Sequence, residues 1–160
     1  MEGQTRFLLT FAISLRRAAR RVEVFAFNTR LTRVTRAIAP NKVPLTLKRL
    51  GESVTDWSGG TRIGECLTEF VRDYAGMVNS RTTVVILSDG LDRGDPEVLA
   101  RAMRSIRARA GAVVWLNPLL GDARYEPTAR GMAAALPYVD RLAPAHNLES
   151  LERLVTMLGR

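Results

Sequence analysis

The chain is poor in the residues that most often carry chemistry, with 1 Cys and 1 His among 160 residues. A single cysteine cannot form an intramolecular disulfide, and Cys66 and His146 are too few ligands for a Cys/His zinc site. Cys66 is spaced from Ile63, Leu67 and Phe70 as on one face of a helix, so we interpret it as a packed core thiol. His146 is interpreted as a loop residue.

Long hydrophobic runs are also missing. The apolar segment from Phe7 to Leu15 is interrupted by Thr10 and Ser14, and its arginines follow it, whereas an export signal carries its positive charge first. No apolar stretch approaches the roughly 20 residues that span a bilayer. We therefore expect a soluble, cytoplasmic protein without a membrane partner.

Aromatic residues make up only 6% of the chain, although its formal net charge is +8. The basic excess lies toward the two ends of the sequence and consists almost entirely of arginine. Phosphate binding by the arginines of residues 16–36 is therefore an alternative function. The few aromatics limit base stacking and no nucleic-acid motif is present, so a nucleic-acid partner is not the main expectation.

The length and ordinary globular composition predict a single domain over residues 1–160. Apolar spacing and cap signals predict helices over residues 5–21, 44–54, 61–77, 95–109, 127–135 and 147–158. β-branched and aromatic runs predict strands over 22–27, 31–35, 82–87, 112–116 and 138–142. The first two strands suggest a hairpin, and the run 82–87 suggests a strand covered on both faces. This alternation predicts an α/β fold with a mostly parallel sheet and one antiparallel edge strand.

Two segments carry oxygen ligands. Asp89 follows a predicted strand, and Thr61 begins a predicted helix. Carboxylate and hydroxyl oxygens suit Mg²⁺ or Mn²⁺. The neighbouring residues would support such a site: Ser58, Gly59, Gly60, Ser88 and Gly90. A second interpretation stays open, in which Thr61 is an ordinary helix cap and Asp89 a turn residue.

Two sequence motifs are specific enough to indicate a family: Trp57-Ser58-Gly59-Gly60-Thr61-Arg62 and Trp115-Leu116-Asn117-Pro118. Through them the chain resembles the CoxE-like group of von Willebrand factor A (VWA) domains. Further matching stretches are Val24–Thr35, Leu87–Gly90, Tyr125–Pro127, Gly131–Met132 and Leu136–Asp140. Together they span nearly the whole chain, and they imply the Rossmann-like, three-layer fold of this family.

The resemblance also implies a metal-ion-dependent adhesion site, with Thr61 and Asp89 as two of its ligands. The family's Asp-x-Ser-x-Ser motif is not found, and Met1 falls where the methionine after that motif belongs. We therefore expect a chain truncated at its N-terminus that lacks the first central strand. Losing that strand would remove roughly 6 to 12 kcal/mol of apolar burial, so we expect marginal stability and weak or absent metal binding.

The resemblance implies a function in protein interaction rather than catalysis. CoxE-like proteins are associated with maturation of metalloenzymes such as aerobic carbon monoxide dehydrogenase, beside a MoxR-type AAA+ ATPase. The cation would accept a carboxylate from a protein partner as its last ligand. A hydrolase is a third hypothesis, with Asp89 as nucleophile or base and Asp92 or Asp95 as the second acid.

Overall fold

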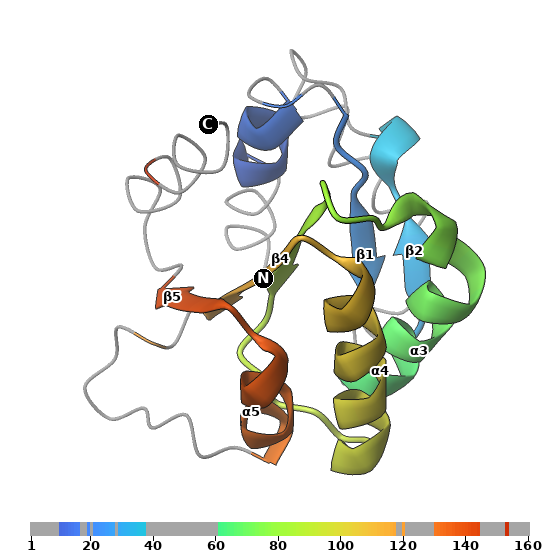
Figure 1. Cartoon of the computed structure of the whole chain (residues 1–160), viewed down its shortest axis with the longest axis vertical. Coiled ribbons are helices and arrows are strands. Elements are labelled where there is room, and N and C mark those ends of the chain that lie inside the picture. Colours follow the sequence, from blue (N-terminus) through green and yellow to red (C-terminus); the bar gives the residue numbers. More distant parts are fainter. Residues whose placement is uncertain are drawn as a thin grey trace. The chain divides into compact units, whose positions relative to one another are not determined.

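The protein is described by a computed structural model that covers residues 10–16, 19, 21–27, 29–37, 61–117, 120, 130–144 and 153 (Figure 1). The chain divides into two compact units. One comprises Met1–Ala26, Thr32–Trp57 and Asn147–Arg160, and the other Phe27–Leu31 and Ser58–His146. Within the described residues, no helix combines the length and the hydrophobicity of a membrane span.

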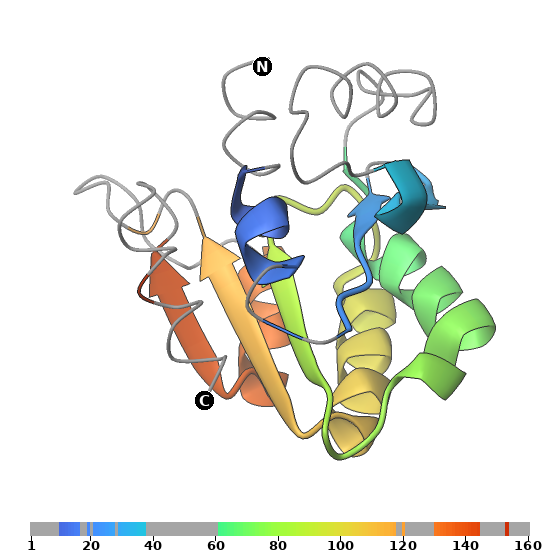
Figure 2. The same ribbon diagram turned by 90° about the horizontal axis from the view of Figure 1, so that it is seen from above.

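The larger unit is built on a three-stranded parallel sheet. Its strands are β3 (Thr83–Leu87), β4 (Ala112–Asn117) and β5 (Arg141–Pro144), in the order β3-β4-β5. Parallel neighbours need crossover connections, and α4 (Pro96–Arg109) and α5 (Arg130–Ala135) lie in these two connections. Together with α3 (Ile63–Tyr74), they cover one face of the sheet (Figure 2). The predicted α/β class is confirmed.

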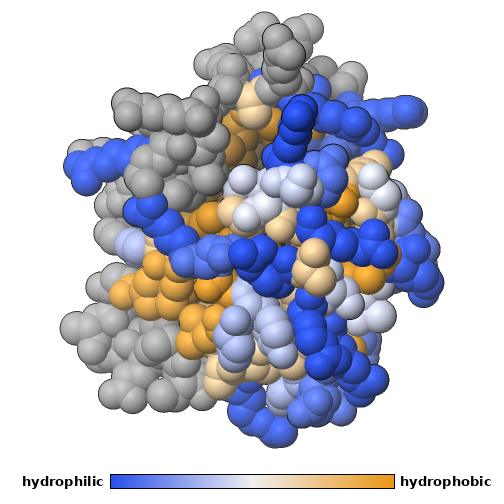
Figure 3. Space-filling view, in the orientation of Figure 1, coloured by the Kyte–Doolittle hydropathy of each residue, from blue (hydrophilic) through white to orange (hydrophobic). Residues whose placement is uncertain are grey.

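The core of this unit lies between β4 and the helices. β4 is buried from Val113 to Asn117, and Trp115 is fully buried. The inner face of α4 is formed by the buried side chains of Leu99, Met103 and Ile106. The outer surfaces of α3 and α4 are mostly hydrophilic (Figure 3). The predicted core position of Cys66 is confirmed, because its side chain is buried on α3.

The predicted start of the helix over residues 95–109 is confirmed. Asp95 is the N-cap, and its Oδ1 accepts a hydrogen bond from the backbone N–H of Glu97 at 2.9 Å. Pro96 occupies the first turn, where no N–H donor is needed.

At its C-terminal end, α3 passes into a 3-10 turn, η2 (Ala75–Met77). The Thr82 hydroxyl donates a hydrogen bond to the Met77 carbonyl at 3.4 Å.

Two predicted strands need correction. β3 is not covered on both faces, because only Ile86 is buried among its five residues. β5 begins at Arg141 rather than Tyr138, because residues Leu136–Tyr138 form a 3-10 turn, η3. The Asp140 side chain accepts from the Val113 N–H at 2.7 Å, and its own N–H donates to the Val113 carbonyl at 2.9 Å. These two hydrogen bonds join the end of the η3 turn to β4, and the strand pairing of β5 with β4 begins at the next residue, Arg141.

The predicted hairpin is present as a separate two-stranded sheet of β1 (Phe25–Phe27) and β2 (Leu31–Arg33). The second strand is shorter than predicted, since Thr35 begins a 3-10 turn, η1 (Thr35–Ala37). Within the part of the chain that the structure describes, β3 has β4 as its only strand neighbour, and the absent central strand stays a prediction. Residues 10–16 are helical, while the predicted helix 44–54 and most of 147–158 lie outside the described residues.

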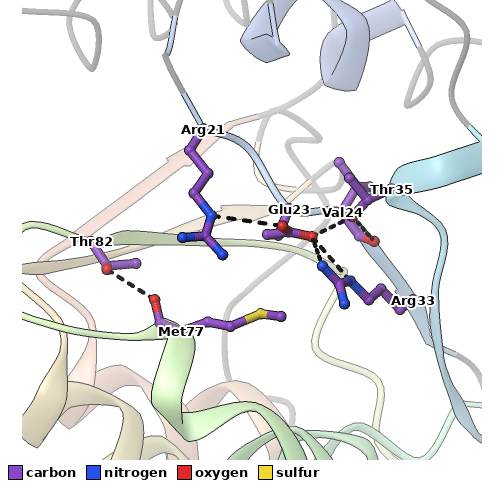
Figure 4. Close-up of polar contacts among 7 residues, drawn as sticks. All are labelled: Arg21, Glu23, Val24, Arg33, Thr35, Met77 and Thr82. Carbon is purple, nitrogen blue, oxygen red and sulfur yellow. Dashed lines mark hydrogen bonds and ion pairs between the residues drawn. The ribbon is translucent and has the colours of Figure 1, made fainter.

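Glu23 is the centre of a polar cluster beside β1 (Figure 4). Its carboxylate accepts from the Arg33 guanidinium at 2.7 Å and from the Thr35 hydroxyl at 2.8 Å, and Arg21 lies 3.8 Å away. Burial alone would raise the pKa of Glu23. The hydrogen bonds from Arg33 and Thr35 and the charges of Arg33 and Arg21 outweigh it, so the pKa lies below its ordinary value of 4.5.

This cluster predicts acid sensitivity. A lowered folded-state pKa means that Glu23 stabilises the fold fully above pH 4.5 and progressively less as the pH falls through the folded-state value. We expect Glu23→Gln to lower the free energy of unfolding at pH 7 by roughly 1 kcal/mol and to flatten its fall in acid. Chemical denaturation from pH 7 to pH 3 measures both effects.

Glu97→Gln is the matched control, because Glu97 is exposed and has no ion pair among the described residues. Identical pH profiles for the Glu23 variant and the wild type would contradict the role assigned to this cluster.

Candidate cation-binding site

The loop after β3 is shaped by its own short polar side chains. The Ser88 hydroxyl accepts from the Gly90 N–H at 3.1 Å, and Asp89 Oδ1 accepts from the Leu91 N–H at 2.9 Å. Gly90 has φ of +79°, a conformation that other residues adopt only under strain. The loop therefore turns sharply at the carboxyl end of β3, where ligands bind in sheets of this kind.

Two buried side chains near the end of β4 donate hydrogen bonds to the main chain of this loop. Trp115 Nε1 donates to the Ser88 carbonyl at 2.9 Å, and Asn117 Nδ2 donates to the Asp89 carbonyl at 3.4 Å. The Ser88 N–H in turn donates to the Leu116 carbonyl at 3.0 Å. Asn117 is the one buried polar residue in the described part of the chain, and its side chain is fully buried. The main chain of Asp89 is therefore anchored to the core through β4.

The first turn of α5 packs against the same loop. A side chain built on Gly90 would overlap Met132, and one built on Gly131 would overlap the Gly90 carbonyl. Gly90 is therefore required by close packing as well as by its backbone conformation, and Gly131 by close packing. The loop is held on two sides, by β4 and by α5.

The segment that contains Thr61 is hydrogen-bonded to this loop. The Thr61 carbonyl accepts from the Arg93 N–H at 3.0 Å. Asp92 Oδ1 accepts from the Ile63 N–H at 2.9 Å and from the Gly94 N–H at 3.1 Å. Figure 2 shows the start of α3 and the loop after β3 at the end of the sheet to which the β4 arrowhead points. The structure thus brings the Thr61 and Asp89 segments together.

The interpretation of Thr61 as a helix cap is wrong, and that of Asp89 as a turn residue is confirmed. Thr61 does not cap α3: the N-cap residue is Arg62, and no side chain of that residue caps the helix. The Thr61 hydroxyl has no hydrogen bond among the described residues, and the residue is half-buried. Asp89 does act as a turn residue through its bond with Leu91. The Thr61 hydroxyl is left without a structural function here.

The donors fit a hard cation in kind but are few in number. Thr61 and Asp89 offer a hydroxyl and a carboxylate, which suit Mg²⁺ or Mn²⁺. No group of three or more Asp, Glu, His or Cys residues that could hold a metal is found within the described ranges. Ser58, Gly59 and Gly60 lie outside those ranges. Cation binding at Thr61 and Asp89 therefore stays a prediction.

The surface beside the loop combines one apolar and several charged groups. Leu91 is 55% exposed, the one large hydrophobic residue so exposed in the described part of the chain. Arg62 pairs with Glu65 at 3.0 Å, and Arg93 is exposed. A ligand that reached Asp89 would meet this mixed rim.

Comparison with known proteins decides the family. The model of the family described as "VWA domain containing CoxE-like protein" matches residues 1–151. The chain belongs to the CoxE-like VWA family. No curated protein and no solved structure matches it. The family resemblance and the fold class predicted from the sequence are thereby confirmed. In this CoxE-like chain, the Trp-Leu-Asn motif now has a physical function, since Trp115 and Asn117 bond the carbonyls of Ser88 and Asp89.

Asp92 has a structural function that the sequence did not reveal. The sequence suggested it only as the second acid of a hypothetical hydrolase, and the structure shows that its carboxylate caps α3 across 29 residues of sequence. The one signal in the sequence was that arginine, the N-cap residue of α3, is not a capping residue. Thr61, immediately before it, is a good capping residue and made a local cap the natural expectation.

Gly90 provides a stability test of this loop. We expect Gly90→Ala to lower the free energy of unfolding by about 1 to 3 kcal/mol, because it combines backbone strain with overlap of Met132. Gly76→Ala is the control, since a side chain there meets nothing within 4 Å. Its effect should stay within about 0.5 kcal/mol. Equal losses in the two variants, measured by chemical denaturation, would show that the loop is not packed as described.

Proposed function

We propose that this CoxE-like VWA domain is a non-catalytic docking domain whose partner binding depends on a divalent cation at Thr61 and Asp89. The observation that carries the proposal is the junction between the start of α3 and the loop after β3. Two hydrogen bonds, Arg93 N–H to Thr61 and Ile63 N–H to Asp92, bring these segments together. Such a junction would allow ligands from two separate elements to converge on one ion.

The Asp89 carboxylate and the Thr61 hydroxyl would hold Mg²⁺ or Mn²⁺. A bound cation would supply a positive charge and an open coordination position. Such ions retain several waters when a protein provides few ligands, and a carboxylate from a partner can replace one of them. The chain's own contribution is to hold Thr61 and Asp89 in place through Asp92, Trp115 and Asn117.

The contacts of the acidic residues favour docking over hydrolysis. The hydrolase hypothesis needs a second acid beside Asp89, and Asp92 and Asp95 were the candidates. Asp92 Oδ1 already accepts two backbone hydrogen bonds, and Asp95 Oδ1 accepts one as the cap of α4. These carboxylates serve the backbone, and Cys66 is buried in the core.

Membership of the CoxE-like family supports a function in maturation of a metalloenzyme of the aerobic carbon monoxide dehydrogenase type. As the protein partner we propose a MoxR-type AAA+ ATPase. An acidic side chain of such a partner would complete the cation's ligands, and Leu91 and Arg93 would lie at the rim of the contact.

The nucleic-acid alternative is not favoured by the arginine contacts. Arg16 donates to the Thr35 carbonyl at 3.1 Å, and Arg33 and Arg21 pair with Glu23. Three arginines of the segment 16–36 therefore have contacts within the chain, and the Glu23 carboxylate offsets one of their charges.

The proposal predicts loss of cation binding in two variants. Thr61→Val removes the hydroxyl at nearly constant volume, and Asp89→Asn removes the charge. We expect each to weaken Mg²⁺ binding by at least about tenfold, because each removes one of few protein ligands. Titration calorimetry with Mg²⁺ measures the affinity, and binding of a purified MoxR-type ATPase with and without chelator measures its consequence.

Thr61→Ser, which keeps the hydroxyl, and Asp73→Asn, at an exposed ion pair on the last turn of α3, are the controls and should bind Mg²⁺ as the wild type does. Partner binding that survives chelator unchanged would exclude a cation-dependent mechanism.

A further inference from the structure

We propose that Asp92 is the positioning residue of the cation site: its carboxylate fixes the Thr61 segment against the Asp89 loop. The inference rests on the proposed function, because it concerns the geometry of the same site. Asp92 is not offered as a ligand of the ion.

The first step is the position of the carboxylate. A single oxygen, Oδ1, accepts from Ile63 N–H at 2.9 Å and from Gly94 N–H at 3.1 Å. Ile63 begins α3 and is fully buried, and Gly94 ends the loop that carries Asp89. One atom therefore joins the two segments that would hold the ion.

The second step is that α3 has no cap of its own. Its N-cap residue, Arg62, provides no side-chain hydrogen bond. The first N–H groups of a helix need acceptors, and a negative charge at this end is favoured by the helix dipole. Asp92 meets both needs from another element, so the start of α3 depends on the loop after β3.

The third step concerns the other oxygen of the carboxylate. Asp92 Oδ2 is buried and has no hydrogen-bond partner among the described residues. A buried carboxylate oxygen without a partner is unfavourable, and such groups in native proteins call for an explanation other than stability. The described hydrogen bonds of this carboxylate are therefore those of Oδ1 alone, and they are the bonds that make the junction.

The fourth step connects Asp92 to Thr61. The Thr61 carbonyl accepts from Arg93 N–H, the residue next to Asp92. Without Asp92, this single hydrogen bond would be the only one described between the Thr61–Ile63 segment and the loop. Small displacements of ligands reduce metal affinity strongly, so looser attachment of Thr61 should weaken cation binding.

The chain offers a matched control in Asp95. This residue lies three positions later and also accepts a backbone N–H, that of Glu97, at 2.9 Å. It caps α4 and makes no described bond to α3. Asp92→Ala and Asp95→Ala therefore remove similar caps, but only the first removes the junction. Asp92→Asn keeps the Oδ1 acceptor and should preserve the junction.

The test compares hydrogen exchange and Mn²⁺ affinity in the full chain. We expect Asp92→Ala to speed exchange of the Arg93 amide, which Asp92 does not itself bond, at least tenfold relative to Asp95→Ala. We also expect Mn²⁺ affinity to fall about tenfold in Asp92→Ala, with wild-type values for Asp95→Ala and largely restored values for Asp92→Asn.

The two proposals fail in different ways. Equal Arg93 exchange in the two alanine variants would overturn the positioning function, whether or not Mn²⁺ binds. A wild-type chain that binds no Mn²⁺ even at the high concentrations that would detect weak binding would overturn the proposed function, and the exchange comparison would still test Asp92. If Asp92→Ala does not fold, Asp92→Leu and Asp95→Leu replace the alanine pair, because leucine keeps the approximate volume of the side chain without its acceptor oxygens. The same comparison of Arg93 exchange then decides: faster exchange in Asp92→Leu supports the positioning function, and equal exchange overturns it.

Discussion

The hydrogen bond between the Asp92 carboxylate and the Ile63 N–H is the constraint on which this end of the molecule depends. It joins a helix that begins far earlier in the sequence to the loop that leaves β3. A charged acceptor bonds a helix amide more strongly than a neutral one, and here it replaces a cap that α3 does not carry itself. The Thr61 segment is thereby placed beside the loop that contains Asp89.

Contacts with the rest of the larger unit fix the position of the loop that contains Asp89. Trp115 and Asn117 bond its carbonyls from the buried end of β4, and Gly131 allows α5 to approach it closely. A docking site benefits from this construction, because a partner need not spend binding energy on ordering the loop. Only Leu91 and the charged rim would then adapt to the partner.

Local signals predicted the local structure well. Asp95, Pro96 and Glu97 marked the start of α4, and the apolar run before Ser88 marked β3. The boundary of β5 was missed because it is set by bonds between Asp140 and Val113, which are distant in sequence. Asp92 was missed for the same reason: nothing near it shows that its hydrogen-bond donor is Ile63. The motifs indicated Thr61 and Asp89 as ligands, but only the structure shows what joins their segments.

A CoxE-like VWA domain of this construction would act by presenting an ion, with Thr61 and Asp89 as ligands from two elements. The most direct test is the effect of Mn²⁺ on amide NMR signals, since a bound paramagnetic ion broadens the signals nearest to it. The account predicts that substoichiometric Mn²⁺ broadens the amides of Thr61 and Asp89 together, at the same concentration. Broadening of only one of them, or of an unrelated acidic surface instead, would contradict it.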